Sequence, residues 1–157
     1  MEERDLRVVM ATPELLNEVA ANARQEDIDE LWASNTVTPE EAMSMGSKYG
    51  TTFVLMCEDK ALCAFGIVPF SVLSAVGAPW MVGTKDLEQH ARPFIRKCRR
   101  ELGVYFSEWS RLFNFVDARN VKSIRWLRWL GFKILPPMPY GPFKMPFHPF
   151  IMEDSHV

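Results

Sequence analysis

The fold is decided by one stretch of the sequence, Asp117-Ala118-Arg119-Asn120-Val121-Lys122-Ser123-Ile124-Arg125-Trp126-Leu127-Arg128-Trp129-Leu130-Gly131-Phe132. It follows the apolar run at residues 112–116, which predicts a buried strand. Asn120 is a residue type that often caps the start of a helix. Gly131-Phe132 is typical of a left-handed helix stop that passes into a new strand. The stretch therefore predicts a strand, one short helix and a second strand in close succession.

The rest of the chain shows the same mixture of helical and strand periodicities, without a repeat. Strands are expected at 6–10, 51–58, 61–69, within 74–84 and from Phe132. Helices are expected at 13–33 (one, or two with a kink), from 39 to Gly46 or Lys48, and at 93–109. In the proline-rich tail at 135–157, residues 135–142 are expected not to form a regular ladder, and residues 143–152 to form a final edge strand bent at Pro146 and Pro149. This order predicts an α+β fold, in which helices cover both faces of a mixed, mostly antiparallel sheet.

Composition narrows the class of protein. With 157 residues, 48% hydrophobic and 24% charged, the chain is expected to form one globular domain over residues 1–157. No window approaches about 18 uninterrupted apolar residues, so no membrane span is expected. The charged N-terminus lacks the apolar segment of a secretion signal, so we expect a cytoplasmic location. Cys57, Cys63 and Cys98 lack metal-ligand spacing and are expected to be free thiols, although the first two could approach each other across a hairpin.

Charge is distributed unevenly along the chain. Residues 1–46 contain eleven acidic and three basic residues, whereas residues 92–133 contain eleven basic and three acidic ones. Such polarity is found in surfaces that bind nucleic acid and in pockets for anionic ligands, but also in two solvated faces that complement each other. The sequence leaves these readings open, and weak binding of polyanions is one expectation.

The opening stretch resembles the end of the acyl-CoA-binding half of the Gcn5-related N-acetyltransferases (GNAT). That family has the pattern Asn-x-x-Ala-x-x-x-Tyr-x-x-x-Gly-Phe, and here Asn120, Ser123, Leu127, Gly131 and Phe132 stand in those places. The order of expected elements is similar as well, so the resemblance covers nearly the whole chain. It implies a GNAT-type fold and an acyl-CoA-dependent N-acyltransferase.

The resemblance also implies a cofactor site for acetyl-CoA or CoA. In the family, backbone groups at the end of the central strand hold the acyl carbonyl and the pantetheine amides, and the next loop turns N–H groups onto the pyrophosphate. Asn120 would reach the pantetheine arm, or it simply caps its helix. The candidate cofactor-binding residues are Met81, Val82, Gly83, Thr84, Lys85, Arg92, Arg96, Asn120 and Ser123.

The cofactor loop departs from the family pattern Arg/Gln-x-x-Gly-x-Gly/Ala. Only Gly83 remains of its glycines, and Asp86 and Glu88 bring negative charge to the place of the pyrophosphate. Pro93 removes an amide donor. The cations at Lys85, Arg92 and Arg96 could compensate as phosphate partners.

The catalytic residues of the family do not carry over. Leu127 stands where many relatives have a Tyr that protonates the departing thiolate, and leucine cannot transfer a proton. Tyr105 and Tyr140 are the nearest alternative donors, and residues 76–82 contain no carboxylate to act as a base. The remaining candidates, His90, His148 and His156, are isolated in the sequence, so no catalytic residue is assigned.

Aromatic and basic residues alternate in the expected helix. Trp126 and Trp129 beside Arg125 and Arg128 could stack on nucleotide rings. The favoured interpretation is packing, in which the tryptophans widen a buried stripe of leucine and isoleucine while the arginines extend to solvent.

A second resemblance is to the small internal virion proteins of T7-like phages, which look like degenerate GNATs. It rests on Trp80-Met81-Val82-Gly83-Thr84, the basic helix at 92–100, Phe113-Asn114-Phe115-Val116, and Asn120 followed by Ile124-Arg125-Trp126-Leu127 and Gly131. It implies a phage protein in the host cytoplasm or virion, with a phage or host protein as partner. Two functions stay open: an N-acyltransferase with an altered cofactor loop, and a non-catalytic interaction protein of phage assembly or host takeover.

Overall fold

The computed structural model describes residues 5–71, 73 and 75–153, without the side chains of Tyr105 and Phe106. His156 and the Tyr105 side chain, both weighed above as catalytic candidates, therefore lie outside the described residues. In chain order the elements are β1 (Leu6–Met10), α1 (Pro13–Ala21), α2 (Gln25–Asn35), α3 (Pro39–Tyr49), β2 (Thr52–Cys57), β3 (Lys60–Pro69), β4 (Val76–Gly83), the 3-10 helix η2 (Lys85–His90), α4 (Ala91–Phe106), β5 (Arg111–Asp117), α5 (Val121–Leu130), β6 (Lys133–Ile134), β7 (Met138–Tyr140) and β8 (Met145–Glu153).

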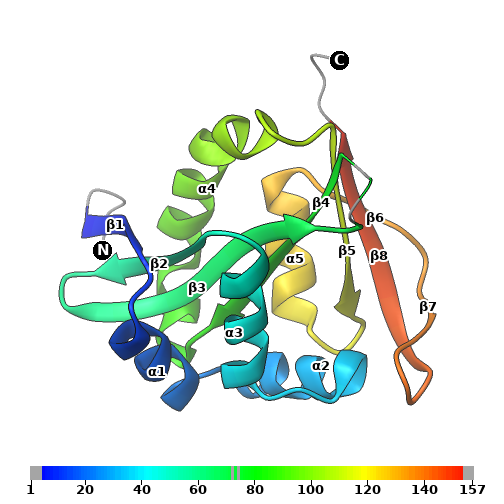
Figure 1. Cartoon of the computed structure of the whole chain (residues 1–157), viewed down its shortest axis with the longest axis horizontal. Helices are drawn as coiled ribbons and strands as arrows, with labels where there is room; N and C mark the ends of the chain where they lie inside the picture. The colour runs from blue at the N-terminus through cyan, green and yellow to red at the C-terminus, as the bar shows by residue number, and fades with distance from the viewer. Residues whose placement is uncertain (1–4, 72, 74, 154–157) are drawn as a thin grey trace.

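The strands form one sheet in the order β1-β2-β3-β4-β5-β8-β6, and β7 also pairs with β8 (Figure 1). All neighbours are antiparallel except β4 and β5, which are parallel. One buried cluster joins the sheet to α4 and α5, and another joins the opposite face to α1 and α3. The predicted α+β fold, a mostly antiparallel sheet with helices on both faces, is confirmed.

The parallel strands β4 and β5 meet only at their beginnings. Their register contains two pairs, Val76 with Arg111 and Gly77 with Leu112. Beyond these pairs the strands diverge, and β3 and β8 continue as the antiparallel neighbours of each. The sheet is therefore open between the carboxyl-terminal halves of its two central strands.

The first helical region is divided, as one of the two alternatives for residues 13–33 required. Thr12 caps α1 by accepting a hydrogen bond from the Leu15 N–H, and α1 ends at Ala21. Residues 22–24 cross to α2, and Ala23 forms a single β-bridge with Thr84. The 3-10 helix η2 was not predicted; it lies between β4 and α4, which begins at Ala91 rather than at Pro93.

Two expectations about the tail are wrong. β8 is no edge strand, because β5 lies on one side of it and β6 and β7 on the other. The region 135–142 does contain a paired strand, β7. The Pro149 carbonyl accepts a hydrogen bond from the N–H of Leu135, which lies between β6 and β7. The missing N–H of Pro149 is on the same side, so it interrupts no pairing with β5. The Pro146 carbonyl accepts a hydrogen bond from the N–H of Ala118, just past the end of β5. The missing N–H of Pro146 therefore also lies outside the β5–β8 ladder.

The helix α5 confirms part of its prediction. Gly131 has φ +104°, the left-handed stop expected there, and Ile124 is buried. Asn120 precedes the helix but its side chain makes no capping hydrogen bond, so the capping interpretation is wrong. Trp126 is buried as expected, whereas Trp129 is 42% exposed and does not widen the buried stripe.

Two further observations concern thiols and membranes. Cys57, Cys63 and Cys98 are free, as expected, and in the β2–β3 register Cys57 faces Lys60 while Cys63 faces Leu55. Within the described residues, each helix is too short or too polar to cross a lipid bilayer.

Candidate functional site

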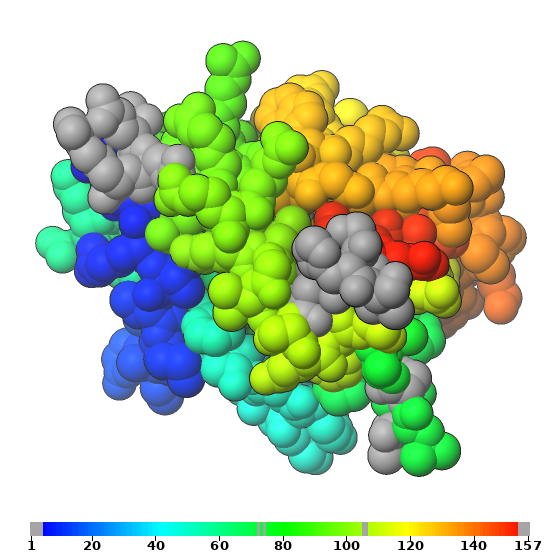
Figure 2. Space-filling view, turned by 90° about the horizontal axis from the view of Figure 1, so that it is seen from above, coloured from blue at the N-terminus to red at the C-terminus, as the bar shows by residue number. Residues whose placement is uncertain are grey.

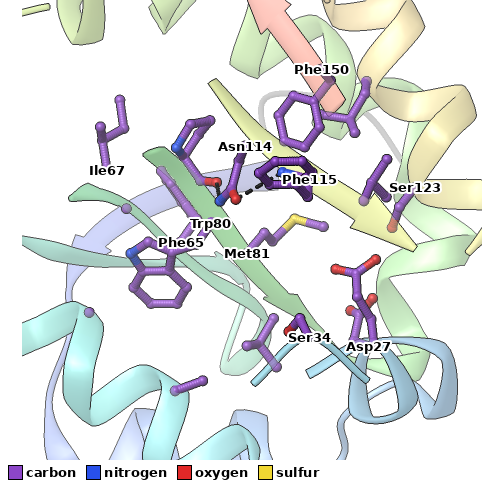
Figure 3. Close-up of a pocket in the computed structure, with 18 of the residues that line it drawn as sticks. Asp27, Ser34, Phe65, Ile67, Trp80, Met81, Asn114, Phe115, Ser123 and Phe150 are labelled. Carbon is purple, nitrogen blue, oxygen red and sulfur yellow. Dashed lines mark hydrogen bonds between the residues drawn. The ribbon is translucent and has the colours of Figure 1, made fainter. Parts of the chain in front are cut away.

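A cavity of about 490 Å³ occupies the opening between β4 and β5. Trp80 and Met81 line it from β4, Asn114 and Phe115 from β5, and Figure 3 shows these side chains around the gap. Other parts of its wall come from α2, with Asp27 and Glu30, and from α5, with Ser123. The cavity is therefore mostly apolar with a carboxylate-bearing end, which is typical of a small-molecule site.

Along β4, the backbone N–H and C=O groups of successive residues point alternately toward β3 and toward β5. The Pro79 carbonyl accepts a hydrogen bond of 2.8 Å from Asn114 Nδ2 across the gap. The Gly83 N–H donates to Asp27 Oδ2 at 2.8 Å, and the Gly83 carbonyl accepts from the Arg24 N–H. Because alternate residues of a strand direct their backbone groups to the same side, Met81 also directs its N–H and C=O into the gap. Among the described residues, no side chain forms a hydrogen bond with those two groups.

The polar end of the site is organised by Arg24, in the connection between α1 and α2. Its side chain is only 1% exposed, and its guanidinium carbon lies 4.9 Å from the centre of the Trp126 ring. It donates to Asp27 (2.8 Å), Glu88 (3.0 Å), Glu26 (3.2 Å), Ser123 (3.3 Å) and Asn120 (3.4 Å). All its nitrogens therefore have partners, and the charge is buried within an ion network drawn from α2, η2 and α5.

Asn120 completes this network. Its Oδ1 accepts from Arg24, while its Nδ2 donates to Asp27 Oδ1 at 2.9 Å and to Glu30 Oε1 at 3.3 Å. Glu30 also accepts the Asp117 N–H at 2.8 Å, which ties α2 to the end of β5. The side chain of Asn120 is thus fully engaged inside the protein.

The carboxyl groups of the network differ in their protonation. Burial raises the pKa of Asp27, although Arg24 opposes the shift. Burial, and secondly the nearby Asp27 charge, raise the pKa of Glu30 to about 8. For Glu88, burial acts upward, but hydrogen bonds from Lys122 and Arg24 outweigh it and lower the pKa. The protonated form of Glu30 is therefore favoured, and its pKa is suited to proton exchange near pH 8.

The predicted cofactor residues fall into two groups. Gly83, Asn120 and Ser123 are brought together around Arg24 and Asp27, and Met81 faces the gap. The others lie elsewhere: Val82 is buried opposite Ala64 of β3, the Thr84 hydroxyl donates to the Leu62 carbonyl, and Lys85, Arg92 and Arg96 lie exposed on η2 and the first turns of α4. That these residues bind a cofactor stays a prediction.

The loop after β4 does not suit a pyrophosphate. The amides of Gly83, Thr84, Lys85 and Leu87 donate to the Asp27 carboxylate and to the carbonyls of Leu62, Asn22 and Thr84, respectively. Asp86 and Glu88 lie in the same segment, and both form ion pairs with basic residues. A phosphate-binding nest requires amides that are free to turn toward an anion. These four amides are therefore engaged within the protein and do not fit a pyrophosphate-binding nest.

Sequence reasoning missed Arg24 and Glu30. Arg24 is one of three basic residues among eleven acidic ones in residues 1–46, and this isolation was a usable signal for a buried cation. Glu30 had no such signal, because it lies on an acidic helix and reaches the site only through the packing of α2 against β5.

The remaining proton-transfer candidates are separated. Tyr140 lines the cavity, where its ring stacks on Phe115 with centroids 4.0 Å apart, and burial raises its pKa. His148 Nδ1 lies 2.8 Å from the Leu135 carbonyl, and His90 Nδ1 is buried without a hydrogen-bond partner in the described part of the chain. Leu127 lines the cavity from α5, where it offers no proton.

Comparison with known proteins places this geometry in context. No family model and no curated protein matches the chain. Among solved structures, a spermidine N-acetyltransferase from Vibrio cholerae, in complex with CoA and spermine, matches with a TM-score of 0.70 and 12% identity, covering 97% of each chain. The fold is that of the GNAT acetyltransferases.

Further GNAT-fold neighbours agree. An N-acetyltransferase from Staphylococcus aureus Mu50 has a TM-score of 0.71 at 13% identity, covering 94% of this chain and 98% of its own. A ribosomal-protein-S5-alanine acetyltransferase from Vibrio fischeri has a TM-score of 0.65 at 14% identity, covering 96% and 94%. At these identities the likeness concerns the GNAT fold alone, and function must be argued from the site.

Proposed function

We propose that this chain is a non-catalytic interaction protein on a GNAT fold, in which a buried ion network has replaced acyl-CoA. The observation that carries the proposal is the buried Arg24 guanidinium, which binds Asn120 and Ser123. These are the two α5-side positions that the family resemblance assigned to the cofactor. Arg24 thus supplies from within the chain the polar contacts that a bound pantetheine would otherwise make.

The energetics support this replacement. A cofactor that engaged Asn120 and Ser123 would have to displace Arg24, leaving the buried Asp27 without its cation. Breaking a buried ion pair by removing one partner costs about 3–5 kcal/mol. At about 1.4 kcal/mol per tenfold change, the displacement weakens cofactor binding by roughly a hundredfold to several thousandfold. Acetyl-CoA is therefore expected to bind only at millimolar concentration or not at all.

The origin and partner are proposed from the second resemblance. The aromatic-Asn-aromatic-Val motif shared with the phage internal virion proteins lies on β5, where Asn114 spans the gap to Pro79. This position gives the motif a structural role that does not depend on catalysis. We infer a phage-encoded protein of the host cytoplasm or the virion, with a phage or host protein as partner.

A second candidate is an N-acyltransferase that works with an altered cofactor groove. It is favoured by the free backbone of Met81 in the cavity and by the Glu30 carboxyl, whose pKa of about 8 suits a general base. This candidate requires Arg24 to leave its place, together with a proton donor that Leu127 does not provide.

The test is a titration with acetyl-CoA, followed by isothermal calorimetry and by the melting temperature. Under the first proposal, acetyl-CoA at about 100 µM leaves the melting temperature unchanged, since stabilisation follows RT ln(1 + [L]/Kd) and the ligand stays below its Kd. Glu88→Gln weakens the hold on Arg24 and is expected to raise the affinity. Glu153→Gln makes the same chemical change in an exposed ion pair with Arg111, outside this loop and the Arg24 network, so it is the matched control.

The outcome decides between the two candidates. Micromolar binding by the unaltered protein, with release of free thiol in the presence of an amine, would overturn the non-catalytic proposal. Binding without thiol release would leave a ligand-binding protein that does not transfer the acyl group.

A further inference from the structure

The exposed side of α4 and α5 forms a basic surface. On α4 the exposed residues Arg92, Arg96 and Arg99 follow one another at spacings of four and three, so they share one side of the helix. On α5 the exposed residues Lys122, Arg125 and Arg128 follow one another at spacings of three. We call these six residues the basic surface.

The fold holds the two helices side by side. On their buried sides, the rings of Phe94 and Trp126 meet edge to face with centroids 6.2 Å apart. At one end, Lys122 forms an ion pair with Glu88, which precedes the first turn of α4. Figure 1 shows α4 and α5 as neighbours, and the view from above in Figure 2 shows α4 over a broad part of one face beside the later segments of the chain. The two basic rows therefore belong to one region of the molecule.

Within the part of the chain that the structure describes, the acidic side chains of η2, α4 and α5 all form ion pairs. Glu101 pairs with Lys97 on the same helix at 3.3 Å, and Glu88 is held by Lys122 and the buried Arg24. The exposed acids of the amino-terminal half, such as Glu14, Asp29 and Glu40, lie on α1, α2 and α3. Of these helices, α1 and α3 pack on the face of the sheet opposite α4 and α5, so acidic and basic side chains are concentrated on opposite sides of the molecule.

An exposed aromatic ring lies within the basic surface. Trp129 is 42% exposed and follows Arg128, one turn of helix after Arg125. The exposed part of this ring can stack on an aromatic ligand beside the arginines. Bases of single strands stack on such rings, whereas the bases of a duplex are already paired and stacked.

We propose that the basic surface of α4 and α5 binds single-stranded nucleic acid. Its arginines and lysine contact backbone phosphates, and Trp129 stacks with an unpaired base. The spacing of the cations along two helices provides a track for several consecutive phosphates, and the acidic opposite face keeps the strand on this side by repulsion. This function is independent of the β4–β5 cavity and of whether acyl-CoA binds there.

The test is fluorescence anisotropy with a labelled, unstructured single-stranded RNA of about 16 nucleotides, a length within the site size of single-strand-binding domains. Binding is expected to weaken steeply between about 50 and 200 mM salt, because each phosphate contact adds about 0.7 to the slope of log K against log salt. Arg125→Glu is expected to lower that slope by about 0.7 or more. Lys144→Glu makes the same charge change on an exposed residue between β7 and β8 and is the matched control, expected to have little effect.

A second pair of variants examines stacking. Trp129→Leu is expected to weaken binding roughly 5- to 150-fold, the equivalent of one stacked base, at an unchanged salt slope. Trp32→Leu removes another exposed tryptophan, on α2, and is expected to leave binding unchanged.

Four results would overturn the proposal. These are undetectable binding at about 50 mM salt; equal losses in Arg125→Glu and Lys144→Glu; equal affinity for the corresponding duplex; and displacement of the RNA by polyglutamate at equal charge concentration, which would assign the surface to an acidic protein partner.

Discussion

The protonation of Glu30 makes the stability of this protein depend on pH in an unusual direction. Burial raises its pKa from 4.5 to about 8 in the folded chain. A carboxyl group whose pKa is higher in the folded than in the unfolded state takes up a proton on folding, so the free energy of unfolding falls as pH rises between the two values. The wild-type protein should therefore be more stable at pH 5 than at pH 8.

The size of the effect follows from the shift. Each pKa unit corresponds to about 1.4 kcal/mol, so the loss between pH 4.5 and pH 7 is at most about 3 kcal/mol, less any screening by water in the cavity. Glu30→Gln keeps an oxygen that accepts the Asp117 N–H and the Asn120 side chain but cannot ionise. Its advantage in stability over the wild type is therefore expected to grow from pH 5 to pH 8.

Urea unfolding at several pH values between 5 and 8 measures this difference directly. Glu108→Gln makes the same chemical change at an exposed position and is the matched control. If the wild-type curve is flat over this range, or if Glu30→Gln falls in parallel with it, Glu30 is ionised in the folded protein and the reasoning fails.

Two further predictions concern packing and charge. Arg24→Met should lower the free energy of unfolding by about 3–5 kcal/mol, because it strands a buried carboxylate, and adding Asp27→Asn should restore part of it, as chemical denaturation of both variants would show. An additive double variant would contradict the pairing. Gly46→Ala would make a Cβ atom clash with the Trp80 ring and should cost about 1–3 kcal/mol. Gly103→Ala, where a Cβ atom meets nothing within 4 Å, should instead stabilise α4 by about 1 kcal/mol; equal melting temperatures for the two would refute this contrast.

The fold could be predicted because its signals are local. The Gly131 stop and the apolar runs act over a few neighbouring residues, and the helix and strand order followed from them. The prolines of β8 misled the prediction for a definite reason: the effect of a proline on a sheet depends on which neighbour its missing N–H faces, and no local pattern encodes that.

The candidate site was predicted only in part, because its chemistry depends on contacts distant in sequence. Asn120 and Ser123 were predicted to bind a cofactor, and that stays a prediction; the group that contacts both in the fold, Arg24, lies 96 and 99 residues earlier in the chain. Asn is a common helix-capping residue, yet the Asn120 side chain points into the protein. There it forms hydrogen bonds with Asp27, Glu30 and Arg24, and hydrogen bonds to charged groups are stronger than one to an exposed backbone amide.

The position of β8 in the sheet has a consequence for the order in which the protein folds. The strands β1 to β4 form a meander in which each pairs with its predecessor, so this half can assemble as soon as its residues are available. The strand β5 shares only two residue pairs with β4 and is paired along its whole length with β8, which is separated from it by α5, β6 and β7. Until β8 arrives, β5 has an unpaired edge, which can pair with a strand of another chain. The folding intermediate most exposed to wrong pairing is therefore expected late, when β1 to β4 are paired and β5 still lacks β8.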